Sequence, residues 1–392
     1  MGRGFLRDAE WLNSARARGY LWLLAALNMA TLLYIVATSR GGIDRNGFLL
    51  GTDFLSFWTA GQMLHDPAPV YDVAAHSAAQ RRFFDHGDAY TAFFYPPGFL
   101  LVCYPLGFLL YFPALAIWLA GTGAAYLAAV RLWLREAGLP FPALLLAAAF
   151  PPVLITVTHG QTSFLVAALL GLGAFWVRNR PVAAGICFGL ATIKPQFGVL
   201  VPLVLLLTGE WRVIWVAGVT AATLCLAATL AFGAQVWPDW LAVSGAAQAA
   251  MNEGAVGFAK MQSTFAAARL LGLPTGIAYG LQIAVGLAIA GAIASAAWRR
   301  SYTPALGAAM LAGALLVTPF VLDYDMVLLA FPLLWLAGAG FQPWEKAIAA
   351  AAFIAAAFAR PLAVHAGVPI MPLVLAALFV VLVRRAKEAR PA

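Results

Sequence analysis

Five ionisable side chains lie within or beside strongly apolar segments, where a charge is expensive and is usually kept for function. They are His159 in His-Gly-Gln-Thr, Lys194 in Ile-Lys-Pro-Gln, and the carboxylates Asp53, Asp323 and Asp325. A carboxylate can accept the proton of an attacking hydroxyl group. A lysine can neutralise a phosphate that departs with negative charge. The set therefore suits the transfer of a group from a phosphate to a hydroxyl.

Each of these residues also has a purely structural interpretation. Asp53 is suited to cap a helix over 54–64, and Asp323 and Asp325 to cap a helix that begins near residue 326, because Asp is a preferred N-cap. His159 fits a packed or interfacial histidine, and Lys194 can snorkel to the surface. The two aspartates also give a weak signal for a metal. The chain has no Ser-His-Asp order, zinc signature or phosphate-binding glycine loop.

The composition indicates which solvent surrounds the protein. Of the 392 residues, 63% are hydrophobic and 10% are charged, whereas soluble domains carry about 25% charged residues. The mean hydropathy is +0.86, so the chain is predicted to lie in a membrane among its lipids. The net charge of +8 comes from short basic clusters between apolar segments. Such clusters are typical of topology signals, and no nucleic-acid partner is expected because no basic face is present.

The elements that must position the five residues are membrane helices. We predict an all-α polytopic fold, a single integral membrane domain over 1–392 with about twelve transmembrane helices. The expected spans are 19–38, 113–130, 141–157, 164–177, 181–193, 196–208, 211–232, 274–298, 304–320, 326–339, 344–358 and 368–383. Two of them, 181–193 and 196–208, are too short to cross alone if upright and suit a hairpin broken at Lys194. An interfacial aromatic belt is expected to include Trp58, Trp118, Trp237 and Trp240.

The basic residues predict the orientation. Segment 99–110 either spans the membrane or dips into its outer face. If it dips, about 16 of the 24 Lys and Arg residues lie inside; if it spans and the segment around Lys194 is one long helix, about 12 do. The positive-inside rule favours the dip. Residues 1–18 and 384–392 are then a cytoplasmic leader and tail. Residues 39–97, with juxtamembrane helices, and 233–273 are long external loops, so all five ionisable residues fall on the external face.

Short motifs in the chain resemble those of a known family. They are Asp-Phe-Leu-Ser-Phe-Trp-Thr-Ala-Gly at 53–61, Val-Tyr-Asp at 70–72, Tyr-Pro-Pro-Gly at 95–98, Gly-Gln at 160–161, Ala-Gly with Ile-Lys-Pro-Gln within 184–196, and Asp-Tyr-Asp at 323–325. In this order they resemble glycosyltransferase family 87. That family includes polyprenol-phosphate-mannose-dependent mannosyltransferases of the GT-C superfamily.

The resemblance implies a GT-C-like bundle in the inner (plasma) membrane with its active site facing the periplasm or exterior. Such an enzyme moves a sugar, here expected to be mannose, from a polyprenyl-phosphate donor to a hydroxyl of a lipid or glycan acceptor, with inversion at the anomeric carbon. Asp53 matches the position of the catalytic base. The stretch 159–161 lacks the carboxylate that the superfamily often has there, so neither a metal nor another cofactor is expected. Substrate-binding roles are implied for Lys194, at the donor phosphate, and for His159, Gln161, Gln196, Tyr95, Asp323 and Asp325.

A transporter or flippase for a lipid-linked sugar is the main alternative. It shares the helices and the polar cavity, but it predicts charges near the middle of the bilayer and access from both sides. The motifs here are expected at one face, and no internal repeat of the transporter type is evident. A membrane scaffold is the third possibility, although a scaffold does not need Lys194 in an apolar segment.

Overall fold

The computed structural model describes residues 2–66, 68–84 and 90–389, and within them the regular secondary structure is helical, with three isolated β-bridges besides. The expected all-α fold is confirmed. Five helices among the described residues are long and apolar enough to cross a membrane, and they are α2 (Ser14–Thr38), α6 (Tyr111–Glu136), α12 (Trp211–Phe232), α15 (Thr275–Ala297) and α18 (Glu345–Ala366). The number of crossings and the GT-C arrangement stay predictions.

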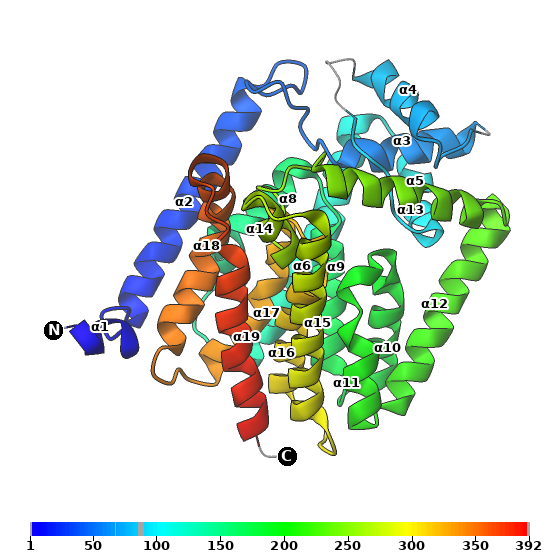
Figure 1. Ribbon diagram of the computed structural model, residues 1–392. Coiled ribbons are helices and arrows are strands. Elements are labelled where there is room, and N and C mark those ends of the chain that lie inside the picture. Colours follow the sequence, from blue (N-terminus) through cyan, green and yellow to red (C-terminus); the bar gives the residue numbers. More distant parts are fainter. Residues whose placement is uncertain (1, 67, 85–89, 390–392) are drawn as a thin grey trace.

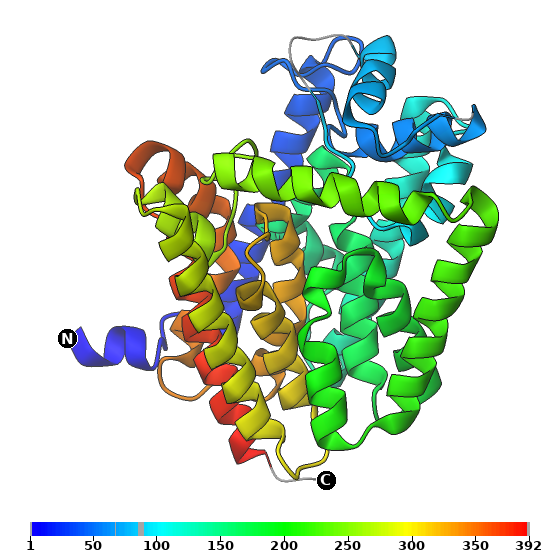
Figure 2. The same cartoon turned by 45° about the vertical axis from the view of Figure 1, so that its right-hand side comes forward.

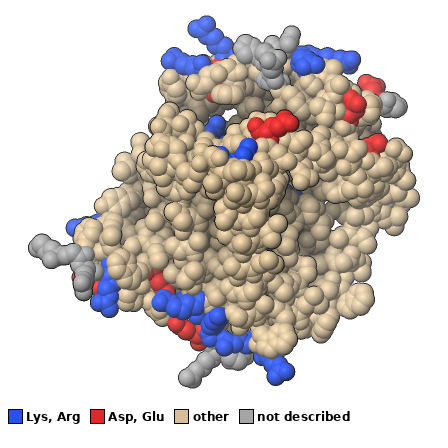
Figure 3. Space-filling model, in the orientation of Figure 1, with Lys and Arg blue, Asp and Glu red and all other residues tan. Residues whose placement is uncertain are grey.

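The helices stand side by side as a bundle with two distinct ends (Figure 1). The upper end, as drawn there, holds the segments between α2 and α6; the lower end holds the C-terminus, and α1 (Gly2–Arg7) lies toward it. Helix α13 (Val236–Glu253) lies across the upper end instead of along the bundle (Figure 2). On the face drawn in Figure 3, Lys, Arg, Asp and Glu gather at the two ends and leave a broad uncharged band between them. Such a band is typical of a protein that crosses a bilayer.

The first long loop folds into short helices at the upper end. They are α3 (Phe54–His65), α4 (Val73–Phe83), η1 (Pro97–Phe99) and α5 (Leu100–Leu106). Helix α5 has 7 residues, about 10 Å at 1.5 Å per residue, against a hydrocarbon core of about 30 Å. A helix this short cannot cross, which agrees with the dip expected for 99–110. Residues 67 and 85–89 of this loop lie outside the described residues.

Close backbone contact holds α5 against α3. A Cβ on Gly61 would lie 2.2 Å from the carbonyl oxygen of Cys103, and one on Gly107 would lie 2.4 Å from the backbone of Gly61. Both positions therefore need glycine, because any side chain would push the two helices apart.

Several apolar helices are short and break where the site is built. They are α7 (Ala143–Ala149), α8 (Pro151–His159), α9 (Ser163–Trp176), α10 (Pro181–Leu190), η2 (Ala191–Ile193), η3 (Pro195–Phe197) and α11 (Leu200–Thr208). The expected hairpin broken at Lys194 is present, since this residue separates η2 from η3 with φ −137° and ψ 71°. The remaining elements are α14 (Thr264–Leu270), α16 (Pro304–Val317), η4 (Asp323–Leu329), α17 (Ala330–Gly338) and α19 (Met371–Glu388).

Candidate functional site

Two distant backbone segments join to place Asp53. The N–H of Gly51 donates to the carbonyl of Thr158 (3.0 Å), and the N–H of Asp53 donates to that of His159 (2.9 Å). Gly51 has φ +75°, and a Cβ there would lie 2.7 Å from Leu115. Glycine is the residue that tolerates such a conformation. The start of α3 is thus fixed to the end of α8.

Gln161 sits at the centre of the site and has only one possible orientation. Its Oε1 accepts the N–H of Thr162 (2.7 Å) and the hydroxyl of Tyr95 (2.9 Å). Because a backbone N–H can only donate, this atom must be the amide oxygen. The amide nitrogen then donates to Asp53 Oδ2 (2.9 Å) and to the hydroxyl of Tyr324 (3.0 Å). Gln161 is buried, so its polar atoms are all satisfied within the protein.

Asp53 presents one carboxylate oxygen to the surroundings. Its side chain makes no capping hydrogen bond to α3, so the interpretation of this residue as a helix cap is wrong. Gln161 holds Oδ2, whereas Oδ1 has no hydrogen-bond partner among the described residues, and the residue is only partly buried. A carboxylate with one oxygen fixed and the other open is arranged to accept a proton.

Lys194 and Asp325 form a buried ion pair. Lys194 Nζ lies 2.6 Å from Asp325 Oδ1, and Ser163 Oγ donates to the same oxygen (2.7 Å). Asp325 Oδ2 accepts the N–H of Leu322 (3.0 Å), so it contributes to the cap of η4 from within that helix, which begins at Asp323 and not near residue 326 as expected. Lys194 is 5% exposed, so the snorkelling interpretation is wrong.

Asp323 has a different cation from its neighbour. Its Oδ2 lies 3.5 Å from the Arg360 guanidinium, a group that extends from the upper part of α18. Burial raises the pKa of Asp323, and the positive charges of Lys260 and Arg360 oppose that shift. The two aspartates therefore pair with different cations. Within the described ranges, no three His, Cys, Asp or Glu side chains are grouped so that they could hold a metal ion.

Four residues of the site were not predicted from the sequence. Tyr324 bonds Gln161, and Lys260 Nζ lies 5.4 Å from its ring centroid, within cation–π range. Trp118 is 5% exposed and donates to the carbonyl of Gly160 (2.9 Å), so its assignment to an interfacial belt is wrong. Arg360 lies two residues beyond the expected span 344–358 and Lys260 lies in a long loop. The signal that could have identified Lys260 and Arg360 is their positive charge near the two aspartates, and this proximity is visible only in the folded structure.

The other two expected residues lie at the edge of this network. His159 Nδ1 lies 2.9 Å from the carbonyl oxygen of Ile155 and donates its proton to that oxygen, so in the neutral ring Nε2 is the nitrogen that can accept a hydrogen bond. The ring centroid of His159 lies 5.8 Å from that of Tyr324. Gln196 is partly buried in η3, two residues after Lys194, and its side chain makes no hydrogen bond to the described residues.

A comparison with protein families identifies the chain. The model of glycosyltransferase family 87 matches residues 93–322, more than half of the sequence. The chain belongs to glycosyltransferase family 87. It is therefore a membrane glycosyltransferase, with a sugar donor and an acceptor as substrates. Searches for similar curated proteins and for similar solved structures found no match.

The family match covers only part of the site of this glycosyltransferase. Tyr95, Gln161 and Lys194 lie inside it, whereas Asp53 precedes it and Asp323 follows its last residue. The roles of the outlying residues thus depend on geometry: the hydrogen bond between Gln161 and Asp53 links the matched region to the carboxylate outside it.

Proposed function

We propose that this enzyme moves a sugar from a polyprenyl-phosphate donor to a hydroxyl of a lipid or glycan acceptor, with mannose as the first candidate for the sugar. Asp53 takes the proton as the acceptor oxygen bonds to the anomeric carbon, and the bond from that carbon to the phosphate oxygen breaks with its electron pair. Attack opposite the leaving phosphate inverts the configuration. The observation that carries this proposal is the open Oδ1 of Asp53 beside the Oδ2 held by Gln161.

The departing phosphate needs a cation, and three are near. Lys260 is partly buried and Arg360 is exposed. The ion pair between Arg360 and Asp323 is long, at 3.5 Å. Lys194 is held at 2.6 Å in a buried pair, and breaking such a pair costs about 3–5 kcal/mol. We therefore assign the first contacts with phosphate to Lys260 and Arg360. Lys194 remains a second contact, reached only if its pair with Asp325 opens.

The remaining expected residues orient the reacting groups in this proposal. Tyr95 and Tyr324 hold Gln161, and Gln161 holds Asp53. His159 and Gln196 bind sugar hydroxyls on either side. No metal takes part, since arginine and lysine supply the positive charge. The site end faces the periplasm or exterior of the inner membrane, in line with the basic residues expected inside.

The test is transfer by the purified, full-length protein. Labelled polyprenyl-phosphate sugars are supplied with a membrane extract as acceptor, with and without a metal chelator, and the product is identified by mass spectrometry. We expect a labelled product that forms equally with the chelator. Movement of the intact donor across vesicles without a product would instead support the transporter, and dependence on a nucleotide sugar would refute the donor class.

A further inference from the structure

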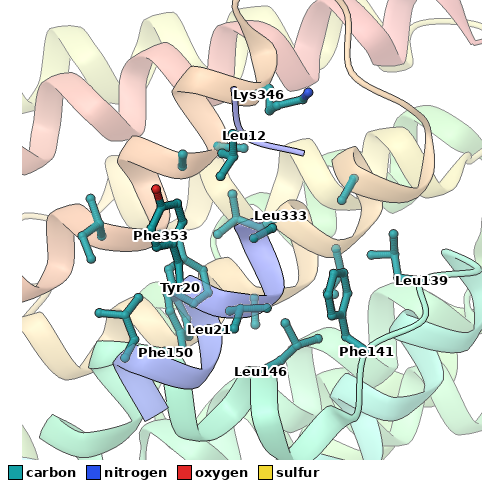
Figure 4. Close-up of a pocket in the computed structure, with 18 of the residues that line it drawn as sticks. Leu12, Tyr20, Leu21, Leu139, Phe141, Leu146, Phe150, Leu333, Lys346 and Phe353 are labelled. Carbon is teal, nitrogen blue, oxygen red and sulfur yellow. The ribbon is translucent and has the colours of Figure 1, made fainter. Parts of the chain in front are cut away.

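A large apolar cavity lies toward the lower end of the bundle, separate from the site described above. Its volume is about 660 Å³, within the range of about 300–1,000 Å³ that is usual for ligand sites. The link between α1 and α2, the first turns of α2, part of α6, the approach to α7 with α7 itself, and the helices α17 and α18 form its walls. Figure 4 shows side chains from these separate elements around it, among them Tyr20, Phe141, Phe150, Leu333 and Phe353. None of the carboxylates of the active site lines it.

Basic groups lie at the mouth of this cavity, the side formed by the link between α1 and α2 and the first turns of α2. Lys346 lines it, and its Nζ donates to the carbonyl of Ala9 (3.3 Å). The Arg18 guanidinium lies 5.9 Å from the ring centroid of Phe141, another lining residue. Arg16 donates to the carbonyl of Trp11 (2.8 Å). Among the described residues none of these three cations lies in an ion pair, so their charges are free to meet an anion.

The nearby acidic groups offset this charge only in part. Glu345, next to Lys346, is fully buried and binds Arg384 (2.6 Å) and Arg385 (2.7 Å). Asp8 and Glu10 are exposed in the link between α1 and α2 and make no ion pair with the described residues. Asp8 and Glu10 therefore offset part of the charge of Lys346, Arg16 and Arg18, and the mouth keeps a net positive charge beside the apolar cavity wall.

We propose that this cavity binds one acyl chain of an anionic membrane phospholipid, whose phosphate lies against Lys346 with Arg16 and Arg18 beside it. Apolar walls take the chain, and a basic pocket between transmembrane helices is suited to an anionic headgroup. Trp11 lines the mouth and is partly buried, as expected for an aromatic residue at the level of headgroups. The ligand belongs to the leaflet around the lower end, so this site is distinct from that of the sugar donor.

The binding test uses the intact protein, purified in detergent and freed of lipid. Dioleoyl phosphatidylglycerol and dioleoyl phosphatidylcholine are titrated, and bound lipid is counted by native mass spectrometry. We expect tighter binding of phosphatidylglycerol. Lys346→Gln should weaken it about fivefold, since each basic residue near an anionic surface contributes about that factor, and should leave phosphatidylcholine unchanged.

Two further variants separate a specific site from general attraction. Arg300→Gln removes another exposed cation that donates to a backbone carbonyl, that of Lys387, but does not line the cavity; it should change neither affinity. Leu333→Trp fills the cavity and should reduce binding of both lipids. Thermal unfolding in detergent checks that the variant is folded.

Three outcomes would overturn the proposal. They are equal binding of the two lipids, equal losses in Lys346→Gln and Arg300→Gln, and displacement of phosphatidylglycerol by equimolar polyprenyl phosphate, which would give the cavity to the donor. None of these measurements involves sugar transfer, so failure here leaves the proposed function untouched.

Discussion

Replacement of Asp53 by Asn is the sharpest test of the proposed chemistry. The amide can rotate so that its oxygen still accepts from Gln161, whose nitrogen faces it at 2.9 Å. A hydrogen bond to a charged group contributes about 1.5–3 kcal/mol and a neutral one about 0.5–1.5 kcal/mol. The expected loss of stability is therefore about 1 kcal/mol, because no cap is lost.

The effect of Asp53→Asn on the reaction should be far larger. A general base contributes about 10²–10⁴-fold to a rate, which is about 2.7–5.4 kcal/mol of barrier at 1.36 kcal/mol per factor of ten. We expect kcat to fall by this factor while the KM for the donor changes little, because in the proposed reaction Asp53 meets the acceptor and not the phosphate. Single-turnover transfer from labelled donor separates the two quantities.

Asp72 provides the matched control on the same loop. Its side chain caps α4 by accepting the N–H of Ala75 (2.7 Å), and Asn caps as well as Asp. Asp72→Asn should thus leave both the melting temperature and kcat unchanged. Turnover by Asp53→Asn within tenfold of the native enzyme would refute the reasoning and direct attention to His159 or Asp323.

Four further predictions follow from the site and its surroundings. Gln161→Ala should lower kcat more than tenfold at constant donor KM, because Asp53 loses the only side-chain partner it has among the described residues; an unchanged kcat would refute the orienting role. Arg360→Gln should lower kcat/KM for the donor by about 10–150-fold, the worth of a charged hydrogen bond of about 1.5–3 kcal/mol, and an unchanged value would remove it from the phosphate site. Burial lowers the pKa of His76 below its ordinary 6.5, so the neutral histidine costs no folding stability above pH 6.5, and the free energy of unfolding falls as the pH drops below that value. His76→Asn should make this fall shallower in thermal unfolding measured from pH 7.5 to 5. An equal slope in the variant and the native protein would refute the role of His76. A cysteine at Arg178 should resist impermeant thiol reagents applied outside intact cells, and labelling there would reverse the proposed orientation.

The sequence predicts the helical class and the segments that break. Apolar stretches, and the proline after Lys194, predict the hairpin that separates η2 from η3. Residues with unusual polarity in apolar surroundings, such as Asp53 and Lys194, were recognised for the same reason: an isolated charge there needs a partner.

The partners themselves could not be predicted, because pairing depends on distance in space. The ion pair between Lys194 and Asp325 joins residues 131 positions apart, and the hydrogen bond between Gln161 and Asp53 joins residues 108 apart. Arg360 was missed for a related reason, since a lone arginine just beyond the alanine-rich span expected over 344–358 resembles a topology signal, although α18 continues to Ala366. The burial of Trp118 also could not be inferred, because interfacial and buried tryptophans have similar sequence surroundings.

The choice of glutamine at position 161 has a consequence for where the reaction leaves its proton. An amide does not titrate, and its two N–H groups are committed to Asp53 and Tyr324. In the proposed reaction, a proton accepted by Asp53 thus has no relay through Gln161 and departs from the open oxygen. Each turnover would then release its acid on the acceptor's side of the membrane, and the enzyme would neither consume nor create a proton gradient across the bilayer.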